Sequence, residues 1–210
     1  MIKIKREKNL YLVAGSDGLS ESVFLKKIED ALAAGITLMQ LREKEKEGGA
    51  IFELAKKVNA LCVKYGVPLI IDDRADIALA AGAAGVHVGQ NDLPVYQARR
   101  LMGSDKIVGA TAKTVEQALA AQRDGADYVG VGAIYPTTTK VKTVLTHVSV
   151  LKDICRAVDI PVFAIGGLNK DNLDPLKGVN IAGIAVVTAI MKPDDTKDAV
   201  KELLTNVGRL

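Results

Sequence analysis

A short run of hydroxyl and cationic side chains directly follows one of the most apolar stretches of this sequence. Tyr128 to Ile134 is apolar and rich in glycine and β-branched residues, which is typical of a buried strand. Pro136 ends that strand, because proline has no N–H to donate to a sheet. The pattern favours an anion-binding site, although a solvated threonine-rich loop would also explain it. The groups that would bind phosphate oxygens are three hydroxyls and an ammonium, those of Thr137, Thr138, Thr139 and Lys140.

A second polar run, Gln40-Leu-Arg-Glu-Lys44, follows another apolar segment. With the two-residue period of a strand, Gln40, Arg42 and Lys44 share one face, and Leu41 points to the other. A carboxamide, a guanidinium and an ammonium then converge on one place. A charged surface loop that runs on into Glu45 explains Lys44 well, but it does not explain a glutamine inside the apolar run.

Two carboxylates follow two further apolar segments. Asp73 lies in Ile71-Asp-Asp-Arg74, and Asp92 lies in Gln90-Asn-Asp-Leu-Pro94. Two carboxylates with few other ligands suit a hard cation such as Mg²⁺, which keeps waters and phosphate oxygens as further ligands. Two structural alternatives stay open, because Asp92 could cap a helix at Pro94 and Asp73 could pair with Arg74.

The elements that must position these residues alternate along the whole chain. Helical periodicity follows each apolar, β-branched segment, and glycine at helix ends marks the re-entry into the next strand. We expect helices near 20–34, 50–65, 75–81, 94–102, 114–123, 147–158, 171–176 and 196–207. We expect strands at Leu10–Ala14, Ile36–Leu41, Val67–Ile71, Gly85–Gly89, Lys106–Ala110, Asp127–Ile134, Pro161–Ile165 and Ile181–Val187.

Strict alternation implies parallel strands, and eight such units without a break in composition predict a single α/β domain, a (β/α)₈ TIM barrel. The domain would span residues 1–210, with 1–9 as an N-terminal extension or helix. The alternative is an open doubly wound sheet, but no Gly-x-Gly-x-x-Gly follows the first strand.

In such barrels the chemistry lies at the carboxyl ends of the strands, and the loops after strands seven and eight commonly hold a phosphate on backbone N–H groups. Gly166-Gly167 and Val187-Thr188 occupy those two loops. A tight turn without a ligand is the weaker alternative, because both loops carry suitable groups. His87 falls in mid-strand and His147 begins a helix, so we expect no catalytic triad.

Composition excludes several classes of protein. The net charge of +3, with 4% aromatic residues and no Trp, argues against nucleic acid as a partner. No apolar run approaches the ~20 residues of a membrane span, and Met1 to Lys8 lacks the apolar part of a signal peptide. Cys62 and Cys155 have no metal-ligand spacing and fit a reducing compartment. We therefore expect a cytoplasmic protein that binds small phosphorylated molecules, and we leave open whether it forms a homo-oligomer.

Several motifs together resemble the thiamine-phosphate synthase family over about Leu10 to Leu204. Their joint occurrence in this order is highly specific. The resemblance implies a (β/α)₈ barrel that uses Mg²⁺ to join hydroxymethylpyrimidine diphosphate to a thiazole phosphate and releases diphosphate. The motifs are Leu10-Tyr-Leu-Val13, Gln40-Leu-Arg-Glu-Lys44, Asp73-Arg74, Gly85-Val-His-Val-Gly-Gln90, Asp92-Leu93, Pro136-Thr-Thr-Thr-Lys140 and Ala164-Ile-Gly-Gly167.

The resemblance also assigns residues to three sites. The metal ligands would be Asp73 and Asp92. The family's catalytic groups would correspond to Arg42, Lys44, Thr111 and Lys140. The pyrimidine diphosphate site would hold Gln40, Leu41, Arg42, Glu43, Lys44, Asp72, Thr111 and Lys140, and the thiazole phosphate site Thr137, Thr138, Thr139, Gly167, Val187 and Thr188.

The chain departs from the family pattern at a few positions. Asp72 stands where the family usually has Asn, Thr111 where it has Ser, and Lys113 where His is frequent. Ala14-Gly15 replaces a common Thr-Asp, and Val141 to Val148 lacks the usual Gly-Leu-Glu. Two alternatives to the synthase remain. One is a thiazole tautomerase-like isomerase, which would need neither metal nor the basic run, and the other is a barrel that binds phosphates without catalysis.

Overall fold

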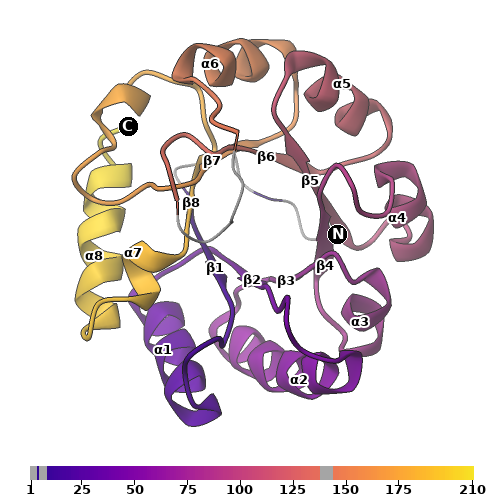
Figure 1. Ribbon diagram of the computed structural model, residues 1–210, viewed down its shortest axis with the longest axis vertical. Coiled ribbons are helices and arrows are strands. Elements are labelled where there is room, and N and C mark those ends of the chain that lie inside the picture. The colour runs from indigo at the N-terminus through magenta and orange to yellow at the C-terminus, as the bar shows by residue number, and fades with distance from the viewer. Residues whose placement is uncertain (1–3, 5–8, 138–143) are drawn as a thin grey trace.

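The computed structural model describes residues 4, 9–137 and 144–210 of the chain. Its eight strands are all parallel and close into a barrel in the order of the sequence, so the predicted (β/α)₈ fold is confirmed (Figure 1). Residues 1–3 and 5–8 of the predicted N-terminal extension lie outside the described residues. The strands are β1 (Asn9–Ala14), β2 (Leu38–Leu41), β3 (Leu69–Asp72), β4 (Gly85–Val88), β5 (Ile107–Ala112), β6 (Tyr128–Gly132), β7 (Val162–Ile165) and β8 (Gly183–Val186).

Helices form the outer ring around the barrel (Figure 1). Ser20 caps the first of them, since its hydroxyl accepts a hydrogen bond from the Val23 N–H. The helices are α1 (Glu21–Ala34), α2 (Gly48–Tyr65), α3 (Ala75–Ala80), α4 (Val95–Met102), α5 (Val115–Arg123), α6 (Val148–Ala157), α7 (Thr188–Met191) and α8 (Thr196–Val207).

Two helical segments differ from the prediction. The helix expected over 171–176 is reduced to a single 3₁₀ turn, η1 (Asp174–Leu176). Asparagine side chains take the backbone N–H groups there, because Asn172 Oδ1 accepts from Asn169 N at 2.9 Å and Asn169 Oδ1 accepts from Asp171 N at 2.8 Å. The short helix α7, directly after β8, was not predicted.

The alternation of side chains along the strands divides the apolar residues into two cores. In β1, Leu10, Leu12 and Ala14 face the helices, whereas Tyr11 and Val13 face the barrel interior. The outer core joins barrel and helices, and its helical members include Phe24 and Ile28. The two free cysteines are buried in the same outer core, as expected.

Three aromatic rings fill the barrel interior. Tyr11, Tyr128 and Phe163 contact each other edge to face, with ring centroids 5.4 to 5.9 Å apart. Gly109 in β5 makes room for one of them, because a Cβ at that position would lie 2.1 Å from the Tyr128 ring. The interior is therefore a packed layer that supports whatever lies above it at the barrel mouth.

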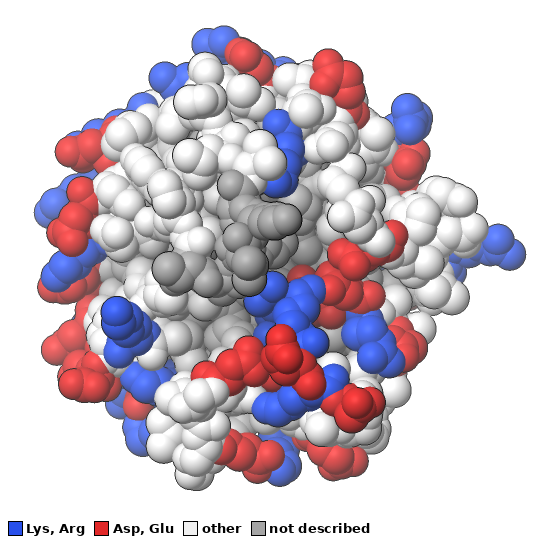
Figure 2. Space-filling model, in the orientation of Figure 1, with Lys and Arg blue, Asp and Glu red and all other residues white. Residues whose placement is uncertain are grey.

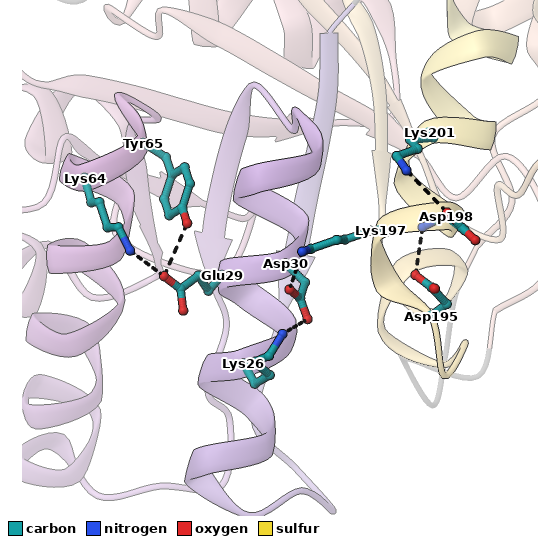
Figure 3. Close-up of polar contacts among 9 residues, drawn as sticks. All are labelled: Lys26, Glu29, Asp30, Lys64, Tyr65, Asp195, Lys197, Asp198 and Lys201. Carbon is teal, nitrogen blue, oxygen red and sulfur yellow. Dashed lines mark hydrogen bonds and ion pairs between the residues drawn. The ribbon is translucent and has the colours of Figure 1, made fainter.

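Ion pairs join neighbouring helices on the outer surface (Figure 3). Lys64 of α2 contacts Glu29 of α1 at 2.7 Å, and Lys197 of α8 contacts Asp30 of α1 at 3.4 Å. The second pair closes the ring where the last helix meets the first. Exposed pairs of this kind add little stability, so the two apolar cores hold the fold together.

Candidate active site

A cavity of about 430 Å³ opens at the barrel mouth, where the strands end. Residues from all eight strands line it, together with the loops that follow the strands. Figure 2 shows acidic and basic side chains next to one another near the centre of the face drawn there. The predicted site residues that line the cavity are Gln40, Arg42, Asp72, Asp92, Thr111, Thr137, Gly167, Val187 and Thr188.

The run from Gln40 to Lys44 divides between the cavity and the surrounding structure. Gln40 and Arg42 line the cavity, as the two-residue period predicted. Leu41 is buried in the outer core between barrel and helices, so its side chain faces away from the cavity. Glu43 also turns away, because its Oε1 accepts a hydrogen bond from Ser16 N at 2.8 Å and thereby ties the loop after β1 to the loop after β2.

Asp72 holds the two cations of this run. Its Oδ2 lies 2.8 Å from Lys44 Nζ and 3.5 Å from Arg42 Nε, and Lys44 also pairs with Asp73. Partial burial works to lower the pKa of Lys44, but these carboxylates outweigh it and raise that pKa, so the ammonium stays charged. Arg42 lines the cavity, whereas Lys44 does not, although the two-residue period predicted both on one face. Lys44 is held next to the cavity by its ion pair with the lining residue Asp72.

Asp73 and Asp92 meet beside this group, at the ends of the neighbouring strands β3 and β4. Burial raises the pKa of Asp92, and the facing Asp73 carboxylate raises it further. Neither structural alternative describes their contacts: Arg74 pairs with Asp76 at 2.6 Å, and Pro94 occupies the N-cap position of α4. Asp92 instead accepts a hydrogen bond from Gly89 N at 2.9 Å.

These two carboxylates fit a hard divalent cation. They face one another closely enough to perturb the titration of Asp92, and a cation between them would relieve their repulsion. Among the described residues no cluster of three or more His, Cys, Asp or Glu side chains is suited to a metal. The donor set therefore suits Mg²⁺ that completes its shell with water and phosphate oxygens, rather than an ion enclosed by protein.

The opposite side of the cavity offers backbone N–H groups. Gly166 and Gly167 follow β7 with φ angles of 100° and 66°, which favour glycine. A Cβ on Gly167 would lie 2.6 Å from the Pro136 carbonyl oxygen, so the loops after β6 and β7 approach one another at this point. Val187 and Thr188 lie at the start of α7, the kind of short extra helix that often accompanies a phosphate site in this fold.

Several lining residues were not among the predicted site residues. Tyr11, His87 and Tyr128 line the cavity from the barrel interior, and Lys113 and Gln90 line it from the loops. His87 is buried and hydrogen-bonded, as its position in mid-strand suggested. The tyrosines carried no signal in the sequence, because each looks like an ordinary apolar strand residue until the barrel brings them together. The predicted residues Thr138, Thr139 and Lys140 lie outside the described residues.

Fold and site together define a (β/α)₈-barrel protein with a cavity lined by charged and polar side chains at the carboxyl ends of its strands. A family model described as thiamine monophosphate synthase matches residues 10–190. The chain belongs to the thiamine monophosphate synthase family, a family of transferases.

Individual proteins agree with this assignment. The chain is 50% identical to the thiamine-phosphate synthase of Clostridium tetani over 92% of its own length and 93% of that protein. It is 48% identical to the thiamine-phosphate synthase of Enterococcus faecalis over 98% and 97%. The structure of thiamine phosphate pyrophosphorylase from Pyrococcus furiosus superimposes with a TM-score of 0.85 at 34% identity, over 96% of each chain.

Among the described helices, none is both long and apolar enough to cross a membrane.

Proposed function

We propose that this chain joins hydroxymethylpyrimidine diphosphate to hydroxyethylthiazole phosphate, giving thiamine phosphate and diphosphate. One observation supports this reaction above all others: a single cavity has fixed cations beside carboxylates on one side and glycine-rich backbone on the other. The reaction needs two anions to be held apart, with their reacting carbon and nitrogen between them. The membership of the chain in its family identifies which anions these are.

The cationic side chains would bind the leaving diphosphate. As the bond between the pyrimidine methylene carbon and the diphosphate oxygen breaks, negative charge grows on that oxygen, and Arg42, Lys44 and Lys140 stabilise it. The methylene cation left on the pyrimidine is then attacked by the thiazole nitrogen. That nitrogen already has a free lone pair, so the reaction needs no general base.

Asp73 and Asp92 would hold Mg²⁺ next to these cations. When bound, the ion supplies further positive charge to the diphosphate oxygens. Lys44 already contacts both Asp72 and Asp73, so it links the carboxylates to the place of the leaving group.

The thiazole phosphate would lie on the other side, on the backbone of Gly167, Val187 and Thr188 and on Thr137 to Thr139. Thr137 lines the same cavity as Gly167 and Thr188, which supports a common site for the three. We also propose a cytoplasmic location, because both cysteines are free thiols in the core.

Turnover by the purified protein tests the function. With both substrates and Mg²⁺, thiamine phosphate and diphosphate should form in equal amounts. Conversion of the thiazole phosphate into an isomer without the pyrimidine substrate would favour the tautomerase alternative. Tight binding of both substrates with no product would favour a barrel that only binds phosphates. The cations and carboxylates at one cavity favour the synthase, since a tautomerase would need neither.

A further inference from the structure

Five side chains from five strands form a continuous row of hydrogen bonds along the cavity wall. Gln40 Nε2 lies 2.6 Å from the Tyr11 hydroxyl, which lies 2.8 Å from the Tyr128 hydroxyl. The Tyr128 hydroxyl lies 3.1 Å from His87 Nδ1, and His87 Nε2 lies 3.0 Å from Thr111 Oγ1. The row begins and ends on residues assigned to the pyrimidine site, and the three residues between them have no part in the proposed reaction.

The partners of each hydroxyl determine the direction of its proton. Tyr11 and Tyr128 are 2% and 0% exposed, and burial raises the pKa of both, so each keeps its proton. Within the described part of the chain, the Tyr11 hydroxyl has only Gln40 and Tyr128 as partners, and Gln40 is itself a donor. The Tyr11 proton must therefore point to Tyr128. The Tyr128 hydroxyl also has Gln40 as a hydrogen-bond partner, again as a donor, so the Tyr128 proton must in turn point to His87 Nδ1.

This order fixes both ends of the row. His87 accepts at Nδ1, so its proton lies on Nε2 and is donated to Thr111 Oγ1. Thr111 Oγ1 thus accepts a hydrogen bond and keeps its own proton for the cavity that it lines. At the other end, Gln40 uses its nitrogen for Tyr11, and its carbonyl oxygen has no partner among the described residues.

We propose that Tyr11, Tyr128 and His87 are positioning residues that set the pattern met by the substrate ring, an acceptor at Gln40 and a donor at Thr111. Such a pair recognises a heteroaromatic ring with an amino N–H on one edge and a ring nitrogen lone pair on another. The row thereby selects and orients the ring whose methylene carbon reacts. The identity of that ring rests on the proposed function, whereas the order of the protons does not.

Nitrogen NMR of the imidazole tests the order of the protons without any substrate. The chain has two histidines, so ¹⁵N-histidine labelling gives two sets of ring signals, and His147→Gln identifies those of His87. We expect His87 in the Nε2–H form in the unmodified protein and in Tyr11→Phe. Tyr128→Phe removes the donor to Nδ1 and should leave a mixture of tautomers. An Nδ1–H form in the unmodified protein would overturn the proposal, because the row would then run in the reverse direction.

Substrate kinetics test the positioning role. Tyr128→Phe and Tyr11→Phe should each raise KM for the pyrimidine diphosphate about five- to tenfold, with KM for the thiazole phosphate nearly unchanged. Tyr65→Phe is the matched control, since it removes a hydroxyl bond to Glu29 on the outer helices and should change neither. If Tyr128→Phe fails to fold, Tyr11→Phe decides.

A double-mutant comparison distinguishes a positioning role of Tyr128 from a general contribution to the stability of the fold. Thr111→Val should make the effect of Tyr128→Phe on KM much smaller, since Tyr128 acts through Thr111 and His87. Independent effects, or equal losses for both substrates, would contradict the proposal. If the unmodified protein makes no thiamine phosphate, the proposed function fails. In that case, calorimetry of pyrimidine diphosphate binding to the same variants tests the positioning role of Tyr11 and Tyr128 in place of KM.

Discussion

At the scale of single residues, Asp72 is the most informative departure from the family pattern. Its carboxylate pairs with both cations to which we assign the leaving diphosphate, at 2.8 Å from Lys44 and 3.5 Å from Arg42. Asparagine, which the family usually has here, would hold the same side chains without a negative charge. On the proposed site, we therefore expect the diphosphate to compete with Asp72 for these cations.

Asp72→Asn should strengthen the binding of inorganic diphosphate about three- to tenfold, because a nearby like charge is removed. Calorimetry with Mg²⁺ present measures the change. Asp76→Asn is the control, since Asp76 pairs with Arg74 at the surface and should have no effect. Weaker binding in Asp72→Asn would mean that the carboxylate itself serves the metal.

Lys44 should matter more in the transition state than in the bound substrate. Lys44→Ala should lower kcat about 10²- to 10³-fold with a modest change in KM for the pyrimidine substrate, as expected for a group that stabilises developing charge. Lys64→Ala, which removes a 2.7 Å surface pair with Glu29, is the control and should leave kcat intact. A large rise in KM at constant kcat would show that Lys44 only binds the ground state.

The two facing carboxylates should cost stability when no cation is present. The folded pKa of Asp92 is raised above its ordinary value of 3.8, so its contribution to stability is full at low pH and is lost as pH rises through the folded pKa. In EDTA at neutral pH, Asp92→Asn should therefore melt higher than the unmodified protein, by no more than about 2–4 °C because solvent screens this exposed group.

The same variant should lose its response to metal. Mg²⁺ should raise the Tm of the unmodified protein and leave that of Asp92→Asn unchanged. Below pH 3 the two proteins should melt together, since the Asp92 carboxylate is then protonated. A stabilisation of the variant by Mg²⁺ equal to that of the unmodified protein would place the ion elsewhere.

At the scale of elements, the loops after β7 and β8 are where we propose that the thiazole phosphate binds. A side chain at Gly167 would meet Pro136 and Tyr135, so substitution there would disturb two loops at once and could not report on one substrate. Thr188→Val removes one hydroxyl at the start of α7 and keeps the volume. It should raise KM for the thiazole phosphate about three- to tenfold, without a matching change for the pyrimidine substrate. A rise in KM for the pyrimidine diphosphate alone would mean that the two anion sites are exchanged, and equal changes in both KM values would contradict a role for Thr188 at one anion only.

The sequence predicted the elements well where their signals were local. The helix predicted near 20–34 is α1, which lies between its caps Ser20 and Gly35 and buries Phe24 and Ile28, two residues at helical spacing. Helix α7 has only four residues, and no side chain caps it, so nothing in its own sequence indicated a helix. The prediction of a helix over 171–176 was wrong for a different reason. The side chains of Asn169 and Asn172 accept hydrogen bonds from backbone N–H groups there and so compete with helical hydrogen bonds.

At the scale of the whole molecule, barrel closure explains which parts of the site could be predicted. Gln40, Arg42 and Asp92 were predictable from their place at strand ends, and they line the cavity. The row through Tyr11 and Tyr128 was not, since these residues are 117 positions apart and meet only when the barrel closes. Local sequence patterns predict the charged residues at the strand ends. The buried hydrogen bonds between distant strands depend on the register of all eight strands, which no local pattern contains.

A crystal structure with thiamine phosphate, diphosphate and Mg²⁺ tests the two-sided site most directly. We expect the diphosphate on Arg42 and Lys44 with the ion on Asp73 and Asp92. The phosphate of the product should lie across the cavity, on the backbone of Gly167 and Thr188. Diphosphate bound at Gly167 and Thr188, or an ion away from both carboxylates, would contradict the account.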